Sequence, residues 1–379
     1  MNQRMKLSIL FGLITISASL FGQKLPIISA HSETVDVREG DELYEQKWII
    51  SPEYNPDIYI TNRANTWVTF YTDLDSISFL SHPDSIYNFI ILLNGKDSAY
   101  TQLKYIPTFL DILKEAEEYD FEDSTQFPEF TYQDSSTSEL KILRKELNLD
   151  SIAGNGGEIL KILNLMHWIH DLIPHDGSHE NPVVKNALSM INECKKEGRG
   201  LNCRGLATVL NECYLSLGIK SRFVTCMPKD SVFNDCHVIN MVFSKDLDKW
   251  IWIDPTQNAY VMDESGTLLG LSEVREKLIL GEMLILNPDA NWNNQVLTNK
   301  QNYLMIYMAK NLYRFSCPLR SEYDYESNQS GKIRQYIELI PLDGYNQSPK
   351  YSRNYLKEAG VTFENYKTNN PNKFWVKPN

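Results

Sequence analysis

The apolar positions between residues 203 and 217 follow the spacing of an α-helix. From Leu206, apolar side chains recur at helical intervals as far as Leu217. Asn202 is a good N-cap residue, and Gly218 is the stop signal expected just past a helix end. The pattern therefore predicts a helix that carries Cys203 on its first turn.

A strand pattern follows this helix. Residues 238–243 alternate in the manner of a strand and residues 250–253 form a short β-prone run, with a polar, turn-like segment between them. The two runs predict an antiparallel β-hairpin. If residues 244–247 form the loop, His237 faces Asp254 directly across the ladder, where side chains on one face lie close enough to interact. A register slip of one residue would place the two side chains on opposite faces.

Cys203, His237 and Asp254 are the residue types of a nucleophile, a base and an orienting group. At a helix start, unpaired amides and the helix dipole stabilise a thiolate and lower its pKa. Asp254 can accept the imidazole N–H, which leaves the other nitrogen free to take the thiol proton. A buried structural thiol is the alternative for Cys203. Cys236 is the rival nucleophile, but strand alternation favours a core position for its side chain, on the opposite face from His237.

Four stretches of this region resemble the transglutaminase-like superfamily. The first two are the Gly-x-x-Cys-x-Gly-x-Ala helix start at residues 200–207 and the Leu-Gly-Ile-Lys-Ser-Arg segment at residues 217–222. The others are a strand that opens with His237 and a Trp-x-x-x-Asp-Pro-Thr close at residues 250–256. The resemblance covers about residues 155–262.

The resemblance implies a papain-like α+β core, in which the nucleophile helix packs on an antiparallel sheet that carries the histidine and the aspartate. It also implies that Cys203 is the nucleophile, His237 the general base and acid, and Asp254 the orienting residue. Members of the superfamily include amide cross-linking enzymes, peptidases and amidases, and some that have lost catalysis. We expect no cofactor and no metal.

Composition fits a globular enzyme. The chain has 379 residues, is 42% hydrophobic and 23% charged, and carries a net charge of −12, which argues against nucleic acid as a partner. Arg4 and Lys6 precede an apolar run over residues 7–20, which predicts an export signal in residues 1–22 and a secreted or periplasmic protein. An uncleaved membrane anchor is the alternative. No second segment is apolar and long enough to cross a bilayer, so no stable span is expected after signal removal.

A cluster of histidines lies before the predicted nucleophile helix. With Asp176 it is a candidate metal site, but the chain has neither a His-Glu-x-x-His pattern nor a Cys-x-x-Cys pair. Because this segment borders the active site in the superfamily, we expect it to form a wall of the substrate cleft. The histidines are His167, His170, His175 and His179.

The remaining organisation is coarser. We expect an N-terminal accessory region in residues 23–138, the catalytic core in residues 139–262, and a C-terminal extension in residues 263–379 that packs on the core or completes its sheet. Residues 24–57 read as irregular and 120–138 as a linker or surface loop. Strands are expected at 66–72, 86–93, 99–105, 333–342 and 374–376, and helices at 109–119, 140–147, 158–172, 272–280 and 302–313.

Three functions are compatible with this pattern. The first is a thiol enzyme that attacks an extracytoplasmic peptide, protein or cell-wall peptide at an amide bond, most simply as a hydrolase, with protein-glutamine cross-linking as the alternative. The second is a non-catalytic binding module on the same fold, and the third is a scaffold protein with an incidental thiol. The second oxyanion donor stays open between the Trp168 indole, Asn202 and the Cys203 amide.

Overall fold

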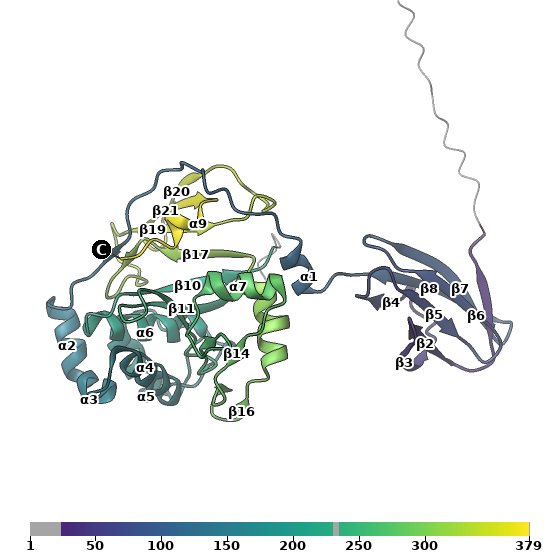
Figure 1. Ribbon diagram of the computed structural model, residues 1–379, viewed down its shortest axis with the longest axis horizontal. Coiled ribbons are helices and arrows are strands. Elements are labelled where there is room, and N and C mark those ends of the chain that lie inside the picture. Colours follow the sequence, from purple (N-terminus) through teal and green to yellow (C-terminus); the bar gives the residue numbers. More distant parts are fainter. Residues whose placement is uncertain (1–23, 230–234, 379) are drawn as a thin grey trace, which may run out of the picture. The chain divides into compact units, whose positions relative to one another are not determined.

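The computed structural model describes residues 24–229 and 235–378, and the predicted export signal lies outside them. The chain divides after Pro107 into two compact units (Figure 1). The accessory region was expected to reach residue 138, whereas residues 108–138 belong to the second unit. There they contribute β9 (Thr131–Tyr132), which pairs with β18 (Arg320–Ser321).

The first unit consists of two four-stranded sheets, ordered β1-β7-β8-β4 and β3-β2-β5-β6. Their inward side chains, such as Phe70 and Phe89, share one apolar core. Asn94 and Gly95 both have positive φ in the tight turn between β7 and β8, as the sequence predicts. The strands are β1 (Ile27–Ala30), β2 (Thr34–Glu39), β3 (Glu42–Ile49), β4 (Asp57–Thr61), β5 (Trp67–Tyr71), β6 (Ser76–Leu80), β7 (Ile86–Leu93) and β8 (Asp97–Tyr105).

The prediction that residues 24–57 are irregular is wrong, because β1, β2, β3 and the first residue of β4 lie there. β1 and β2 do alternate between buried and more exposed residues, but they are short. The residues of β3 are nearly all exposed. A strand without a buried face has no alternation of apolar and polar residues for the sequence to display.

The second unit is built on a seven-stranded sheet ordered β12-β11-β10-β17-β19-β21-β20. β19 and β21 are parallel, and the other neighbours are antiparallel. The C-terminal extension therefore completes the sheet that the core begins. The strands are β10 (Ser221–Met227), β11 (His237–Ser244), β12 (Lys249–Ile253), β17 (Arg314–Pro318), β19 (Ile333–Leu339), β20 (Tyr351–Leu356) and β21 (Val361–Thr368).

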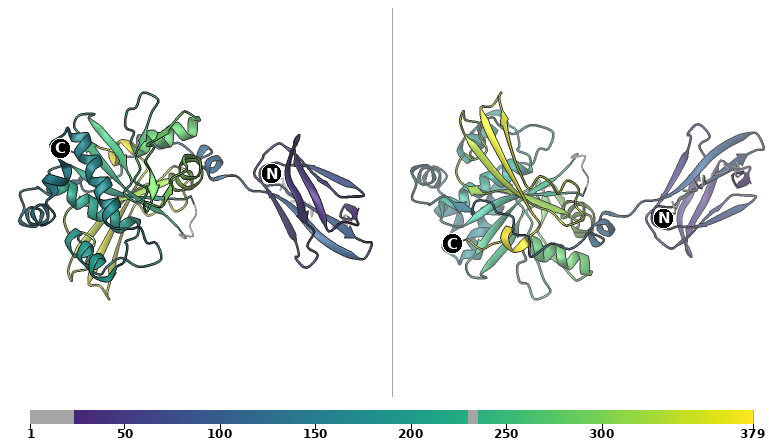
Figure 2. Two further views of the ribbon diagram at one scale, coloured as in Figure 1. Left: turned by 90° about the horizontal axis from the view of Figure 1, so that it is seen from below. Right: turned by 90° about the horizontal axis from the view of Figure 1, so that it is seen from above.

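Helices α2 to α6 gather on one side of the β10–β12 end of this sheet (Figures 1 and 2). α6 lies directly on β10 and β11, and almost all of its residues are buried. The bounds of α4 and α6 agree with the sequence prediction. The helices are α2 (Ser138–Glu146), α3 (Leu149–Ala153), α4 (Glu158–Leu172), α5 (Ala187–Glu197) and α6 (Cys203–Ser216).

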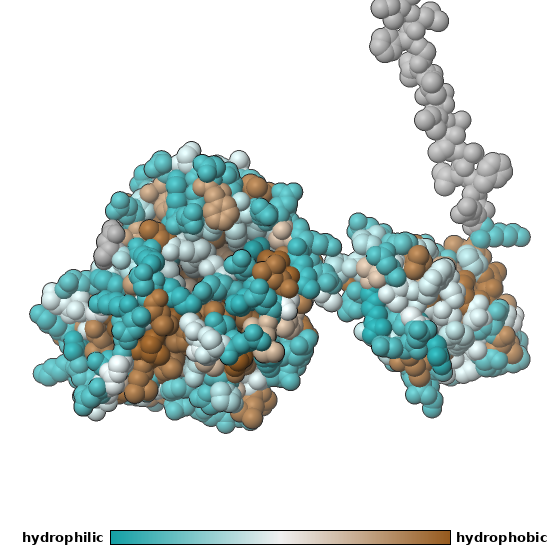
Figure 3. All heavy atoms as spheres, in the orientation of Figure 1, coloured by the Kyte–Doolittle hydropathy of each residue, from teal (hydrophilic) through white to brown (hydrophobic). Residues whose placement is uncertain are grey.

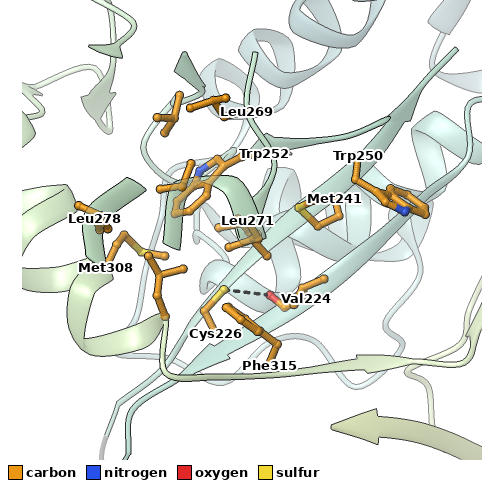
Figure 4. Packing of buried hydrophobic residues seen from close by; sticks show 14 of the residues in the cluster. Val224, Cys226, Met241, Trp250, Trp252, Leu269, Leu271, Leu278, Met308 and Phe315 are labelled. Atoms are coloured by element: carbon orange, nitrogen blue, oxygen red, sulfur yellow. Dashed lines mark hydrogen bonds between the residues drawn. The ribbon is translucent and has the colours of Figure 1, made fainter. Parts of the chain in front are cut away.

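The opposite face of the sheet is covered by the C-terminal extension. Cys226 and Trp252 of the sheet pack there with Leu271 and Met308 of the extension (Figure 4). The elements that follow the core are β13 (Val261–Met262), α7 (Leu271–Leu280), β14 (Ile285–Leu286), β15 (Asn291–Trp292), β16 (Val296–Leu297), the π-helix η1 (Gln301–Met308) and α8 (Ala309–Asn311).

Two terminal predictions need correction. α1 (Phe109–Lys114) stops before the expected residue 119. The prediction of a strand at residues 374–376 is wrong, because Phe374 ends α9 (Pro371–Phe374) and residues 375–376 are in neither a helix nor a strand. The Asn370 side chain caps this helix by accepting hydrogen bonds from two backbone amides, and Pro371 fills its first position, so the local chemistry favours a helix over the apolar run.

Polar residues cover most of the face drawn in Figure 3, and apolar residues form separate patches between them. Within the described ranges, no helix combines the length and the apolar character that a membrane crossing requires.

Candidate active site

Cys203 is the first residue of α6, as the sequence predicts. The Asn202 side chain caps the helix by accepting a hydrogen bond of 3.1 Å from the Gly205 amide. Asn181 clamps this cap, because its Oδ1 accepts from the Asn202 amide at 3.1 Å and its Nδ2 donates to Asn202 Oδ1 at 2.7 Å. A Cβ atom at Gly205 would lie 2.6 Å from Asn181 Oδ1, so only glycine leaves room for the clamp. The sequence contains no signal for Asn181.

His237 and Asp254 form a buried pair. The distance from His237 Nε2 to Asp254 Oδ2 is 2.7 Å, and the two side chains are 2% and 0% exposed. Burial raises the pKa of Asp254, but the charge of His237 and the hydrogen bonds to the carboxylate outweigh it and hold that pKa below its usual value. Asp254 is therefore an ionised partner for the imidazole.

The register of the hairpin differs from the prediction. Ser244 pairs with Lys249, so the loop is residues 245–248 and His237 does not face Asp254 directly. Asp248 takes the left-handed conformation at the end of the loop, with φ of +50°, which aspartate tolerates, and so β12 begins one residue later than expected. The shift keeps both side chains on one face, and they meet diagonally just beyond the last paired residues.

Cys203 reaches this pair from the other side of the sheet. It packs against Val238, whose side chain points toward α6, while His237 shares the opposite face with Ile239. The sulfur lies within hydrogen-bonding reach of the His237 side chain and the Val238 amide. Because Asp254 occupies Nε2, the nitrogen left for the thiol is Nδ1.

The electrostatics of the site favour a thiolate–imidazolium pair. Burial raises the pKa of Cys203, but hydrogen bonds from His175 and His237 and the His237 charge bring it down to about 6. Burial lowers the pKa of His237, but the charge of Asp254 and its hydrogen bond raise it to about 10. Between these values the cysteine is ionised and the histidine is protonated.

Two tyrosines of the π-helix η1 complete the surroundings. The Tyr303 hydroxyl donates to Asp254 Oδ2 at 2.6 Å. The Tyr307 ring packs edge-on against the His237 ring, with centroids 5.3 Å apart, and its hydroxyl lies 3.5 Å from Nδ1. A helix was expected here, but the sequence does not indicate its role, although π-helices often occur at functional sites.

The four histidines do not converge on one point. His170 binds the Pro255 carbonyl through Nδ1 at 3.0 Å, and His167 Nδ1 lies 2.6 Å from Asn258 Oδ1, so both anchor the chain that follows Asp254. The exposed His179 pairs with Asp176 at 2.6 Å. His175 is the one that bears on Cys203, because its side chain helps to lower the pKa of that thiol.

The other cysteines differ from Cys203. All six lie in the described part of the chain and are free. Burial raises the pKa of Cys236 to about 11, so it is a poor nucleophile, yet it precedes β11 and is partly exposed rather than in the core as expected. Cys213 is a core residue, as predicted. Trp168, a candidate oxyanion donor in the sequence, packs against the helical core.

A model of the transglutaminase-like superfamily matches residues 145–255, the segment that contains Cys203, His237 and Asp254. Residues 145–255 are a transglutaminase-like domain. The resemblance inferred from the sequence over residues 155–262 is thereby confirmed, and so is the α+β core in which α6 packs on antiparallel strands. The structure adds Asn181 and His175 within the matched segment, and Tyr303 and Tyr307 beyond it.

Solved structures with similar arrangements include three proteins. A candidate cysteine protease from Cytophaga hutchinsonii has 15% identity and a TM-score of 0.25 over 43% of this chain and 56% of that one. Legionella pneumophila LapG, treated with EGTA, has 9% identity and a TM-score of 0.26 over 38% of this chain and 77% of that one. Red sea bream transglutaminase has 12% identity and a TM-score of 0.21 over 66% of this chain and 52% of that one. The chain thus spans about half the length of the first and third of these proteins. A comparison with curated proteins finds no match.

Proposed function

We propose that the protein is an exported thiol enzyme that cleaves amide bonds through a thioester on Cys203. The observation that carries the proposal is the position of His237, which binds Asp254 at 2.7 Å through Nε2 and reaches the Cys203 sulfur with its other side. This is the relation between nucleophile, base and orienting group that acyl transfer requires.

The chemistry follows from the charges of the pair. The Cys203 thiolate attacks the amide carbonyl carbon, a C–S bond forms, and the carbonyl electron pair moves onto oxygen. When the tetrahedral intermediate collapses, the C–N bond breaks and His237 gives its proton to the leaving amine. His237, now neutral, takes a proton from water as the water oxygen bonds to the thioester carbon. The C–S bond then breaks, the acid is released, and the Cys203 thiolate is restored beside the protonated His237. Asp254 holds the imidazole in place and stabilises its charge throughout.

Hydrolysis is the proposed outcome because water is always available outside the cell. The same acyl-enzyme would transfer its acyl group to a protein amine in a cross-linking enzyme, so the alternative differs only in the acceptor. The apolar run in residues 7–20, after two basic residues, supports export and an extracytoplasmic peptide, protein or cell-wall peptide as substrate.

The test begins with the thiol. Iodoacetamide at about pH 6 should label Cys203 quickly, since an ordinary thiol has a pKa near 8.5 and reacts slowly there. Rapid labelling should be absent in Cys203→Ala, labelling of Cys203 should become slow in His237→Ala, and it should stay fast in the matched control Cys236→Ala. Mass spectrometry identifies the labelled cysteine. Equally slow labelling of all cysteines would contradict the proposal and favour a binding module.

A second measurement separates the two outcomes of the acyl-enzyme. p-Nitrophenyl acetate should acetylate Cys203 with release of p-nitrophenolate, and the acetyl group should then pass to water. Addition of a fluorescent primary amine such as dansylcadaverine distinguishes the acceptors, because a transferase would give the labelled amide in preference to acetate.

A further inference from the structure

His175 is a side chain beside Cys203 that the Cys–His–Asp set does not use. Its backbone pairs with Leu201 in a parallel bridge, in which the Asp176 amide donates to the Leu201 carbonyl at 2.8 Å and the Leu201 amide to the Pro174 carbonyl at 3.1 Å. A Cβ atom at Gly200 would lie 2.3 Å from the Pro174 oxygen, so the two segments touch. His175 is thereby fixed next to a residue two positions before the nucleophile.

A hairpin of the C-terminal extension holds His175 from the other side. Asn293 Oδ1 accepts from the His175 amide at 2.6 Å, and Asn293 Nδ2 donates to the His175 carbonyl at 3.0 Å. Asn293 and Asn294 both have positive φ, and the Gln295 amide closes the turn on the Trp292 carbonyl at 3.0 Å. Asn293 and Asn294 are the central residues of a tight β-turn within the three-residue connection between β15 and β16, so the hairpin presents a rigid edge to His175.

The same hairpin sets the tautomer of the imidazole. Trp292 Nε1 lies 3.3 Å from His175 Nδ1. An indole nitrogen only donates, so Nδ1 must accept, and in the neutral ring the proton is then on Nε2. Because Trp292 occupies Nδ1, the contact with the Cys203 sulfur falls to Nε2–H. The imidazole nitrogen that remains available to Cys203 is therefore an N–H donor.

From this geometry we infer that His175 is a catalytic residue that donates its Nε2–H to the oxyanion of the tetrahedral intermediate. The oxyanion forms on the carbon that is bonded to the Cys203 sulfur, so a donor beside the sulfur is within reach of it. The Cys203 amide, in the first turn of α6 where amides have no intrahelical acceptor, supplies the second donor. Trp292 is a positioning residue. The inference rests on the proposed acyl transfer.

Two reactions of the same thiol separate this role from others. Acylation by p-nitrophenyl acetate passes through an oxyanion, whereas alkylation by iodoacetamide does not. Both rates are measured in the full chain across pH and compared on their plateaus, where the thiolate is fully formed. In His175→Ala, acylation should fall about 10²-fold and alkylation should stay close to wild type. An unchanged alkylation rate also shows that the site is folded.

Three further variants sharpen the comparison. His175→Gln keeps an N–H donor and should recover part of the acylation rate. Trp292→Phe removes only the indole donor and the tautomer it imposes, so acylation should fall by a smaller factor. His179→Ala, an exposed histidine on the same loop, is the matched control and should behave as wild type.

The possible outcomes distinguish failure of the inference about His175 from failure of the proposed function. Acylation of His175→Ala at the wild-type rate overturns the inference but leaves the proposed function intact. Equal losses in acylation and alkylation also overturn it, because His175 would then support the thiolate rather than the oxyanion. If wild type is alkylated quickly but never acylated, the proposed function and this inference both fail.

Discussion

Tyr303 donates a hydrogen bond of 2.6 Å to the same oxygen of Asp254 that receives His237 Nε2 at 2.7 Å. The other Asp254 oxygen accepts from the Thr256 amide at 2.8 Å. The carboxylate is thus held in a fixed orientation by groups from both the matched segment and the C-terminal extension. A buried carboxylate with several donors stays ionised and cannot turn away from the imidazole. The extension is therefore part of the site rather than an appendage.

Tyr303→Phe removes this hydrogen bond with little change in shape. Because the acceptor is charged and buried, the free energy of unfolding should fall by about 1.5–3 kcal/mol. Urea denaturation measures the change. Tyr307→Phe is the matched control on the same π-helix, since its hydroxyl lies 3.5 Å from His237 and its loss should cost much less. Equal losses in the two variants would contradict a special role for Tyr303.

Asp254→Asn tests the orienting role directly. The amide can present its NH₂ group to His237 and favours the wrong tautomer, and it no longer stabilises the imidazolium. Acylation by p-nitrophenyl acetate should fall by about 10³–10⁴-fold, and labelling by iodoacetamide at about pH 6 should become slow because the thiolate loses its charged partner. Near-UV circular dichroism checks the fold. Rapid labelling in this variant would show that the His237 charge does not depend on Asp254.

The sequence predicts the parts of the site that depend on local chemistry. Asn202 and Gly218 delimit α6 because caps and stop signals act within a few residues. Strand alternation also predicts that the His237 and Asp254 side chains lie on the same face of the sheet. The exact register does not, because the conformation of one loop residue, Asp248, shifts the pairing by two.

The missing parts of the site depend on contacts between distant segments. His175 meets Trp292 of a hairpin that is far along the chain, and Tyr303 reaches Asp254 from a helix whose pattern indicates only a helix. No local period encodes such contacts. The same reason applies to the parallel pairing of β19 with β21, because the sequence pattern of a strand does not show which other strand lies beside it.

The opposed pKa shifts of Cys203 and His237 predict how stability depends on pH. The pKa of Cys203 is lowered to about 6 in the folded protein. Its contribution to the free energy of unfolding therefore grows as pH rises toward the pKa of about 8.5 in the unfolded chain. The pKa of His237 is raised to about 10 in the folded protein. Its contribution to the free energy of unfolding is therefore complete below the pKa of about 6.5 in the unfolded chain, and it declines as pH rises toward 10. Between about pH 6.5 and 8.5 the two slopes cancel.

Cys203→Ala should expose the histidine alone, because Asp254 still raises the pKa of His237. Relative to wild type, its free energy of unfolding should decline as pH rises from about 6.5 to 8.5. Urea denaturation at several pH values measures the slope. Parallel pH profiles for the variant and wild type would mean that the pKa of Cys203 is not lowered in the folded protein.

Gly205→Ala tests the clamp that fixes the helix start. Alanine is the better helix former by about 1 kcal/mol, so propensity alone predicts a gain in stability. The added Cβ would lie 2.6 Å from Asn181 Oδ1, however, and would push Asn181 away from Asn202. We expect a net loss of stability and a slower reaction of Cys203 with iodoacetamide, because the cap that places the sulfur is disturbed. Gly157→Ala, where nothing lies within 4 Å of the new Cβ, is the control and should leave the labelling rate unchanged. A more stable Gly205→Ala variant with the wild-type labelling rate would show that the clamp has no influence on the nucleophile.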